Sequence, residues 1–177
     1  MEGQLVVKSD EGAFDGAPAD YVRAARTRVD GAYRLAGYLL GNATEAEDAV
    51  QDALVKAWRN WPALRDPAAF GPWFDRIVVN VCRDRMRRHR TLRMVELDAA
   101  GNVESSDVFG SMVEDDAVAA AVARLSPDHR IVIALRYWRD LTLEQVAGTL
   151  GLPLGTVKSR LHYALRALRS ELEGNHR

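Results

Sequence analysis

The stretch Leu141-Thr142-Leu143-Glu144-Gln145-Val146-Ala147-Gly148-Thr149-Leu150-Gly151-Leu152-Pro153-Leu154-Gly155-Thr156-Val157-Lys158-Ser159-Arg160-Leu161 decides the fold, because it contains two helical patterns separated by a turn. Thr142 is predicted to cap the first helix, and Gln145 completes a capping box. Gly151 stands where a helix commonly ends in a left-handed residue, and Pro153 prevents the helix from continuing. This order of elements is typical of a helix-turn-helix motif, which many DNA-binding proteins use.

The second helix of this motif is predicted to begin near Gly155. Its inward face is apolar and comprises Val157, Leu161, Ala164, Leu165 and Leu168. Its outward face is polar and comprises Thr156, Ser159, Arg160, Tyr163 and Arg166. Helical spacing separates these two sets, and the polar set can donate hydrogen bonds to DNA. The alternative interpretation is an ordinary helical hairpin with a solvated basic face.

Charge is distributed very unevenly along the 177 residues, although the net charge is only −1. Residues 83–93 contain six arginines against the single acid Asp84, and residues 155–169 contain four cations and no acid. Clustered cations repel one another unless they meet an anion, so both blocks favour a nucleic-acid partner over a merely solvated surface. Residues 94–123 contain seven acids and no Lys or Arg, and this acidic stretch is predicted to separate two domains.

Several function classes are excluded by what the chain lacks. Cys82 is the only cysteine, which excludes a disulfide framework and a cysteine-rich zinc site; we expect it to be a buried small apolar residue. The four histidines are dispersed without metal-ligand spacing, and no common catalytic motif occurs. We therefore expect no enzyme activity, no metal and no cofactor. With no signal peptide and no long apolar run, we expect a cytoplasmic protein that does not insert into membranes.

Residues 20–93 are predicted to form an all-α domain after a mobile N-terminal tail, residues 1–19. One helix is expected over 20–40, a second begins after a cap at Thr44 with Glu47, a loop covers 60–72, and a third helix runs over 73–90. The outward side of the third helix carries Asn80, which can read a base edge, and arginines that can grip phosphates. Those arginines are Arg76, Arg83, Arg87 and Arg88.

Residues 117–173 are predicted to form a second helical domain, followed by a short tail, 174–177. Ser126 and Pro127 are a cap and a first-turn proline. The helix that they start should bury Ile131, Val132, Ala134, Leu135 and Tyr137. The predicted fold class is all-α, with two small helical domains joined by a flexible acidic linker, residues 94–116. Because that linker is acidic and rich in small residues, the domains are expected to move relative to each other.

Three motifs resemble one protein family. Residues 45–58, Glu45-Ala46-Glu47-Asp48-Ala49-Val50-Gln51-Asp52-Ala53-Leu54-Val55-Lys56-Ala57-Trp58, and residues 73–80, Trp73-Phe74-Asp75-Arg76-Ile77-Val78-Val79-Asn80, look like region 2 of a bacterial RNA polymerase sigma factor. Residues 155–162, Gly155-Thr156-Val157-Lys158-Ser159-Arg160-Leu161-His162, look like region 4. The order of the motifs, the acidic linker and the lack of further sigma regions resemble the extracytoplasmic-function (ECF, group IV) sigma factors of the sigma-70 family. The resemblance covers about residues 20–172.

The resemblance implies a sigma factor that binds core RNA polymerase, directs it to specific promoters and helps to open the DNA. The polymerase contacts it implies are the β′ clamp helices, met by Asp48, Gln51, Asp52 and Lys56, and the β subunit. Contacts to the minus-ten promoter element are implied for Asn80, Phe70, Arg76, Arg83, Arg87 and Arg88, with the loop 64–70 holding an unpaired base. Contacts to the minus-thirty-five element are implied for Arg136, Thr156, Lys158, Ser159, Arg160, His162, Tyr163 and Arg166. An anti-sigma factor is a further implied partner.

One departure from the family pattern concerns the DNA-reading face. Many members place an arginine after the histidine of the region 4 string, whereas this chain has Tyr163. The promoter sequence therefore cannot be copied from relatives.

Two alternatives to a sigma factor remain at this stage. A stand-alone helix-turn-helix repressor or activator would use its first domain to bind a ligand or to dimerise, but it leaves Asp48, Gln51 and Asp52 without a role. A purely protein-binding module, such as a decoy for an anti-sigma factor, would leave the arginine block of residues 83–93 dispensable.

Overall fold

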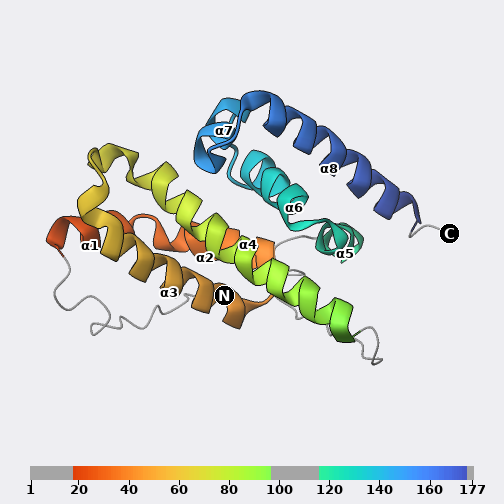
Figure 1. Ribbon diagram of the computed structural model, residues 1–177, viewed down its shortest axis with the longest axis horizontal. Coiled ribbons are helices and arrows are strands. Elements are labelled where there is room, and N and C mark those ends of the chain that lie inside the picture. The colour runs from red at the N-terminus through yellow and green to blue at the C-terminus, as the bar shows by residue number, and fades with distance from the viewer. Residues whose placement is uncertain (1–17, 97–115, 175–177) are drawn as a thin grey trace, which may run out of the picture.

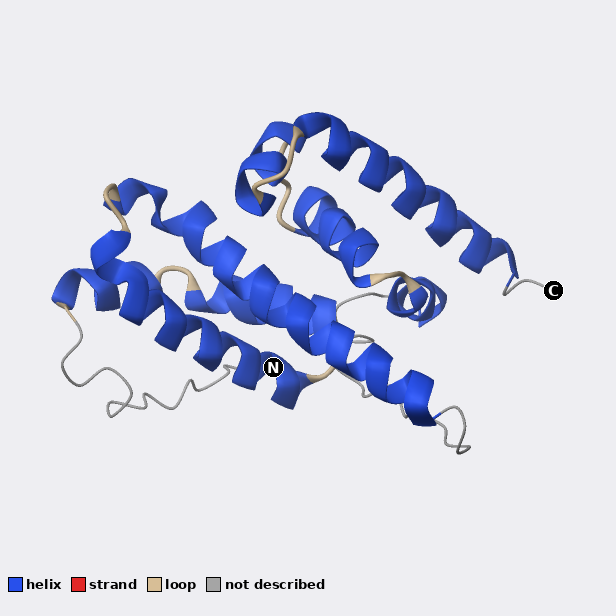
Figure 2. Cartoon of the chain, in the orientation of Figure 1, coloured by secondary structure: helices blue, strands red, loops and turns tan. Residues whose placement is uncertain are grey.

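The computed structural model describes residues 18–96 and 116–174, and within these residues every regular element is helical (Figure 2). The N-terminal domain comprises α1 (Ala19–Arg26), α2 (Val29–Leu40), α3 (Ala43–Asn60), the 3-10 turns η2 (Trp61–Ala63) and η3 (Pro67–Ala69), and α4 (Phe70–Glu96). The C-terminal domain comprises α5 (Asp116–Arg124), α6 (Pro127–Ile133), the π-helical turn η4 (Ala134–Trp138), α7 (Leu143–Leu150) and α8 (Leu154–Gly174). The all-α prediction is confirmed. The predicted tails, 1–19 and 174–177, and the predicted linker lie wholly or largely outside the described residues.

The N-terminal domain packs α2, α3 and the long α4 side by side around an apolar core (Figure 1). An aromatic cluster closes one end of this core: Phe70 stacks on Phe74 with ring centroids 5.3 Å apart, and Tyr21 and Trp61 meet Phe70 edge-on. The buried Tyr21 hydroxyl donates a hydrogen bond to the Leu54 carbonyl oxygen at 2.7 Å. Aromatic rings contribute large buried areas, so this cluster anchors the start of α4.

The predicted single helix over residues 20–40 is wrong, because the chain turns at Thr27 and Arg28 between α1 and α2. The Thr27 hydroxyl donates to the Ala24 carbonyl oxygen at 2.8 Å. A local side-chain bond of this kind offers the backbone an alternative to a continuous helix. The predicted stop at Gly41 is confirmed, since Gly41 is left-handed with φ 70°.

The start of α3 also differs from the prediction. Asn42, not Thr44, is the cap, and its side-chain oxygen accepts a hydrogen bond from the Glu45 backbone N–H at 2.9 Å. The third predicted helix begins earlier as well, at Phe70, and runs beyond residue 90 to Glu96. Pro72 lies in the first turn of this helix, where a backbone N–H has no intrahelical acceptor. The lack of an N–H in proline therefore costs no hydrogen bond there.

The C-terminal domain confirms the predicted cap at Ser126, whose hydroxyl accepts from the His129 backbone N–H at 3.3 Å. Ile131, Val132, Ala134 and Leu135 are buried as predicted, but Tyr137 is 57% exposed. The reason is the π-helical turn η4, which follows α6 and contains Tyr137. A π turn inserts an extra residue and rotates the following side chains away from the regular helical position.

The helix-turn-helix prediction is confirmed in detail for α7, which has the complete capping box of Thr142 and Gln145 and ends at Gly151 with φ 64°. The second helix, α8, begins at Leu154, and Val157 and Ala164 are buried in its inner face. Leu165 was expected to face inward but is 39% exposed, because it lies next to the narrow buried stripe rather than on it.

The two domains are in contact in this structure, and the expected movement of one relative to the other stays a prediction. The C-terminal domain lies along α4, which contacts α6 and α7, while α2 contacts α6 and η4 (Figure 1). This packing places the outward face of α4 toward the helix-turn-helix domain.

Candidate nucleic-acid interface

The outward face of α4 carries the residues predicted to meet the minus-ten element. Asn80, Arg76, Arg87 and Arg88 are exposed, whereas Arg83 is half-buried. Arg83 Nη1 donates a hydrogen bond to the Asn80 side-chain oxygen at 3.1 Å. The structure therefore gathers the predicted base-reading amide and the predicted phosphate-binding guanidinium groups on one helix.

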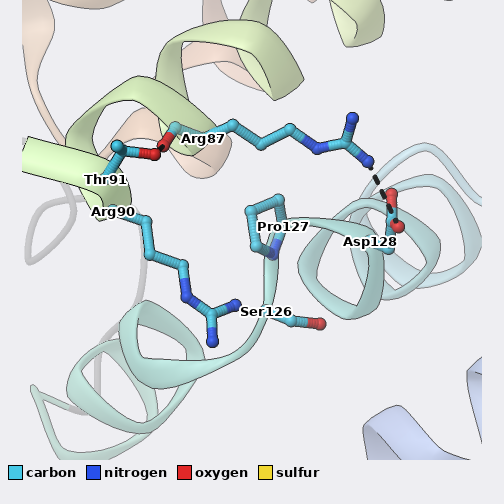
Figure 3. Close-up of a pocket in the computed structure, with 6 residues that line it drawn as sticks. All are labelled: Arg87, Arg90, Thr91, Ser126, Pro127 and Asp128. Carbon is cyan, nitrogen blue, oxygen red and sulfur yellow. Dashed lines mark hydrogen bonds and ion pairs between the residues drawn. The ribbon is translucent and has the colours of Figure 1, made fainter. Parts of the chain in front are cut away.

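Asp128, at the start of α6, connects the two predicted DNA-binding surfaces. Its carboxylate forms ion pairs with Arg83 Nε at 3.1 Å and Arg87 Nη2 at 3.7 Å on α4, and with Arg160 Nη1 at 3.7 Å on α8. In Figure 3 the Arg87 side chain extends from α4 to Asp128 beside a cavity of about 360 Å³, into which Arg90 also extends. Sequence analysis missed Asp128, because its partners are far apart along the chain.

A second contact between the domains joins Asp75 on α4 to Arg139 at the end of η4. Asp75 is 5% exposed, and Arg139 Nη2 donates to both carboxylate oxygens, at 2.8 Å and 2.7 Å. The guanidinium group lies directly over Gly31, where a Cβ atom would come within 2.6 Å of Arg139 Nη1. A buried carboxylate needs such a partner. The sequence contains one signal for this residue: Asp75 is a charged residue directly after Phe74, on the side of α4 that faces inward.

The loop between α3 and α4, which the family resemblance assigns to an unpaired base, borders a cavity of about 540 Å³. Trp61, Arg23 and Arg65 line this cavity together with Asp20, whose carboxylate pairs with Arg23. Phe70 does not line it: the ring is only 3% exposed and packs against Phe74. In this conformation Phe70 supports the loop from the core side and presents no face to a base.

The predicted polymerase-binding residues Asp48, Gln51, Asp52 and Lys56 are all exposed on the outer face of α3. Asp52 Oδ2 pairs with Arg85 Nη2 of α4 at 2.6 Å. The face is thus an accessible, mainly acidic and amide surface, supported at one point by the neighbouring helix.

The predicted minus-thirty-five residues lie mainly on the outer side of α8. Lys158, Ser159, His162, Tyr163 and Arg166 are exposed, and Thr156 and Arg160 are half-buried. The Tyr163 side chain is 56% exposed and meets His162 edge-on. Arg136 lies apart on η4, where its guanidinium group stands 3.6 Å from Asp140 and over the Tyr137 ring.

The pKa shifts of the buried groups arise mainly from burial in the core, which is expected of packing residues rather than of catalytic groups. Burial raises the pKa of the Cys82 thiol to about 12, and burial raises the pKa values of Tyr21 and Tyr38 to about 12 as well. The prediction that Cys82 is buried is confirmed. No group of three metal-ligating side chains occurs within the described parts of the chain. Nor does any described helix have the length and apolar character needed to cross a membrane.

Comparison with known proteins decides the family. The model of sigma-70 region 2 matches residues 24–91, and that of sigma-70 region 4 matches residues 121–170. Over 145 residues the chain is 39% identical to the ECF RNA polymerase sigma factor SigL of Mycobacterium tuberculosis, which covers 80% of this chain and 82% of SigL. The chain belongs to the ECF sigma factors. As a sigma factor it acts with RNA polymerase in transcription initiation, and the repressor alternative is not favoured.

Two further comparisons cover most of this sigma factor. It is 31% identical over 180 residues to the ECF sigma factor SigW of Bacillus subtilis, covering 94% of this chain and 92% of SigW. The sigma factor RpoE of Bartonella quintana, solved in complex with the anti-sigma factor NepR, superposes with a TM-score of 0.67 at 25% identity, over 88% of this chain and 98% of RpoE. The family consists of initiation factors rather than enzymes, which agrees with the absence of catalytic motifs from the sequence.

Proposed function

We propose that this sigma factor uses three separate surfaces: α3 for the β′ clamp helices of core RNA polymerase, α4 with the preceding loop for the minus-ten element, and α8 for the minus-thirty-five element. The C-terminal domain also contacts the β subunit, as the family resemblance implies. The protein works in the cytoplasm, where the polymerase acts. The observation that supports the proposal most is that one chain carries all three surfaces on different helices, with most of their polar residues exposed.

The polymerase surface is the outer face of α3, formed by Asp48, Gln51, Asp52 and Lys56. Its acidic and amide groups suit a basic partner surface, because complementary charge speeds encounter and fixes orientation. Asp48 is the most informative residue of this face to substitute. Asp52 also pairs with Arg85, so a substitution at Asp52 would break that ion pair as well.

The minus-ten surface combines Asn80 and the arginines Arg76, Arg83, Arg87 and Arg88 with the loop cavity beside Trp61. Extruding a base from the duplex costs a few kcal/mol. Stacking on an aromatic ring is worth about 1 to 3 kcal/mol per base and offsets that cost. Phe70 contributes indirectly, because it holds Trp61 and the start of α4 in place.

The minus-thirty-five surface is the exposed side of α8, with Lys158, Ser159, Arg160, His162, Tyr163 and Arg166, and with Thr156 at its start. A recognition helix of this type enters the major groove with its N-terminal residues toward the base edges. Arg136, on η4, contacts the phosphate backbone beside it. Tyr163 adds an aromatic hydroxyl where relatives carry a cation, so the preferred promoter differs from theirs.

An anti-sigma factor is a further partner in this proposal, supported by the solved complex of RpoE with the anti-sigma factor NepR. A pull-down from the host with this chain as bait, followed by mass spectrometry, would identify such a partner.

The decisive experiment is run-off transcription with core polymerase on a pool of promoter fragments from the host genome. We expect specific starts that require this protein. The Asn80→Ala variant should lose promoter opening, measured by permanganate footprinting, while keeping its affinity for polymerase. Asn60→Ala is the matched control, because Asn60 is an exposed asparagine near the end of another helix.

The Asp48→Arg variant should do the reverse and weaken polymerase binding by about tenfold or more, since a like charge would face the basic partner surface. Asp30→Arg makes the same charge change at an exposed position on α2 and should leave binding unchanged. If Asp48→Arg lowers opening without lowering polymerase affinity, and Asn80→Ala does the opposite, the surfaces have been assigned the wrong way round.

A further inference from the structure

The recognition helix α8 carries a large aromatic side chain, Tyr163, on its outer side. This side chain is 56% exposed, whereas Val157 and Ala164 of the same helix are buried. Within the described part of the chain, the Tyr163 hydroxyl forms no hydrogen bond. Tyrosine combines an apolar ring with a polar tip, and such residues are enriched where proteins meet other molecules. Tyr163 is therefore a candidate contact residue rather than a packing residue.

Helical spacing places Tyr163 on one stripe with Thr156 and Ser159, the polar residues nearest the start of α8. The Ser159 hydroxyl donates to the Thr156 carbonyl oxygen at 3.0 Å, so its proton is already used within the helix. Both of these side chains are short, which lets the helix backbone come close to base edges. Tyr163 is the residue of this stripe that reaches furthest outward.

Two arginines flank Tyr163, each three residues away along α8. Arg160 is half-buried and pairs with Asp128, with Arg160 Nη1 at 3.7 Å from the carboxylate. Arg166 is exposed, which suits a contact to the phosphate backbone, and such contacts position a helix without reading sequence. The ring of Tyr163 thus lies between a cation that is already paired and a cation suited to phosphate.

The neighbouring imidazole of His162 restricts the Tyr163 ring. The two ring centroids are 5.5 Å apart, and the planes meet at 77°, which is an edge-to-face contact. Aromatic pairs favour this geometry. A side chain that is already oriented loses less conformational freedom when it binds, so His162 prepares the Tyr163 ring for a contact.

An uncharged aromatic ring is suited to a different base feature from an arginine. In the major groove, arginine pairs with the O6 and N7 acceptors of guanine, whereas apolar side chains contact the C5-methyl group of thymine. Thymine is the only one of the four bases that presents a methyl group there. The exposed ring of Tyr163 therefore fits a thymine methyl group better than a guanine edge.

We propose that Tyr163 is a specificity-determining residue of the minus-thirty-five surface and that its ring reads the methyl group of a thymine. The ring packs on the C5-methyl group, and the hydroxyl is not required for the choice of base. Loss of one buried methyl group corresponds to about a fourfold loss of affinity. The inference rests on the assignment of α8 to the minus-thirty-five element under the proposed function, and it adds the base and the residue that reads it.

The first test selects promoters with the full-length chain bound to core polymerase. The probe is a pool of duplex promoters whose positions around the minus-thirty-five element are randomised. The wild type should enrich thymine at one position on either strand, and Tyr163→Phe should keep that preference. Tyr163→Ala should lose the preference at that position alone, and Tyr163→Arg should replace it by guanine.

Leu165→Ala is the matched control for this selection. It also removes an exposed apolar side chain from α8, since Leu165 is 39% exposed. Two residues correspond to about 200° around a helix, so Leu165 and Tyr163 point to nearly opposite sides. The Leu165→Ala variant should select the same sequences as the wild type.

The second test removes the methyl group from the DNA instead of the ring from the protein. Deoxyuridine replaces the selected thymine, and competition with a fluorescent promoter duplex measures binding by the holoenzyme. The replacement should weaken binding about fourfold for the wild type, for Tyr163→Phe and for Leu165→Ala. It should have no effect on Tyr163→Ala, because the contact is already lost.

An equal effect of deoxyuridine on the wild type and on Tyr163→Ala would overturn the proposal, as would loss of the thymine preference in Tyr163→Phe. A Tyr163→Ala variant that keeps the base preference but binds core polymerase more weakly would place Tyr163 in a protein interface and would also overturn it. Circular dichroism verifies that each variant is folded. Failure of the proposed function looks different: the wild type would then select no promoter and start no transcription with core polymerase.

Discussion

The two helices assigned to promoter DNA, α4 and α8, carry similar cationic faces but differ in what already touches those faces. On α4, Phe74 is buried in the core, and on the outward side Arg83 and Arg87 pair with Asp128 of the C-terminal domain while Asn80 and Arg88 stay exposed. On α8 a narrow buried stripe faces inward, and the opposite side is largely exposed. The number of cations thus says less about DNA binding than whether those cations already have anionic partners.

Under the proposed function the two helices also meet different forms of DNA. The minus-thirty-five element is read as an intact duplex, which an exposed helix can approach. The minus-ten element is bound in the same proposal as an opened strand, and single-strand binding is dominated by charge and tolerates many sequences. The contrast between α4 and α8 can be tested first in the core and then at the surface.

The largest expected effect lies under α4. Phe74→Ala should lower the free energy of unfolding by about 3 to 5 kcal/mol, because it removes a fully buried ring from the aromatic cluster. Val157→Ala under α8 should cost about 1.5 to 2 kcal/mol, since it removes only two buried methyl groups. Urea unfolding followed by tryptophan fluorescence measures both, and equal losses would show that the two helices are anchored alike. Val55→Ala, on an exposed side chain, is the control.

The caps provide a smaller comparison between the domains. Asn42→Ala at the start of α3 and Thr142→Ala at the start of α7 should each cost about 1 kcal/mol, because each removes a side-chain oxygen that accepts from a backbone N–H. Ser170→Ala on α8, exposed and outside a cap, should change the unfolding midpoint little. A null result for Thr142→Ala would mean that the capping box contributes nothing to the recognition motif.

Salt dependence should separate the two cationic faces. Arg166→Ala is expected to reduce the slope of log affinity for duplex DNA against log salt by about 0.9, the value for one lost phosphate contact. Arg83→Ala should leave that slope unchanged in the free chain, since Asp128 already neutralises Arg83. Fluorescence titrations at several salt concentrations give both slopes. If the two variants lower the slope equally, α4 and α8 do not differ in how they contribute to duplex binding.

The smallest expected effect concerns the reactivity of the buried Cys82 thiol on the core side of α4. Burial raises the Cys82 pKa to about 12 from an ordinary value of 9.0, so the thiol stays protonated in the folded chain. Because the unfolded thiol ionises near pH 9.0 and the folded thiol only near about 12, the free energy of unfolding falls as the pH rises across that range. Iodoacetamide should therefore leave Cys82 unmodified at about pH 8 until the chain is unfolded, since the thiolate is the reactive form. Mass spectrometry of native and denatured samples checks this, and rapid native alkylation would contradict the buried position.

Local sequence predicted the helix-turn-helix correctly because its signals are local. Thr142, Gln145 and Gly151 act on backbone groups within a few residues, and the structure places each as expected. The same reasoning misplaced the cap of α3, where Asn42 and Thr44 both offer a suitable side chain and only the geometry selects one. It also missed the break after α1 and the rotation at η4, which put Tyr137 outside the core.

The sequence by itself determined the all-α class, the two helical domains and the helices that carry the candidate surfaces, because periodicity and clustered charge can be recognised along the chain. Only the tertiary structure decided which of those charges are already paired. Asp75 meets Arg139 across 64 positions, and Asp128 meets arginines from two different helices. Such pairs depend on how two domains pack, and no periodic pattern encodes a contact between residues so far apart.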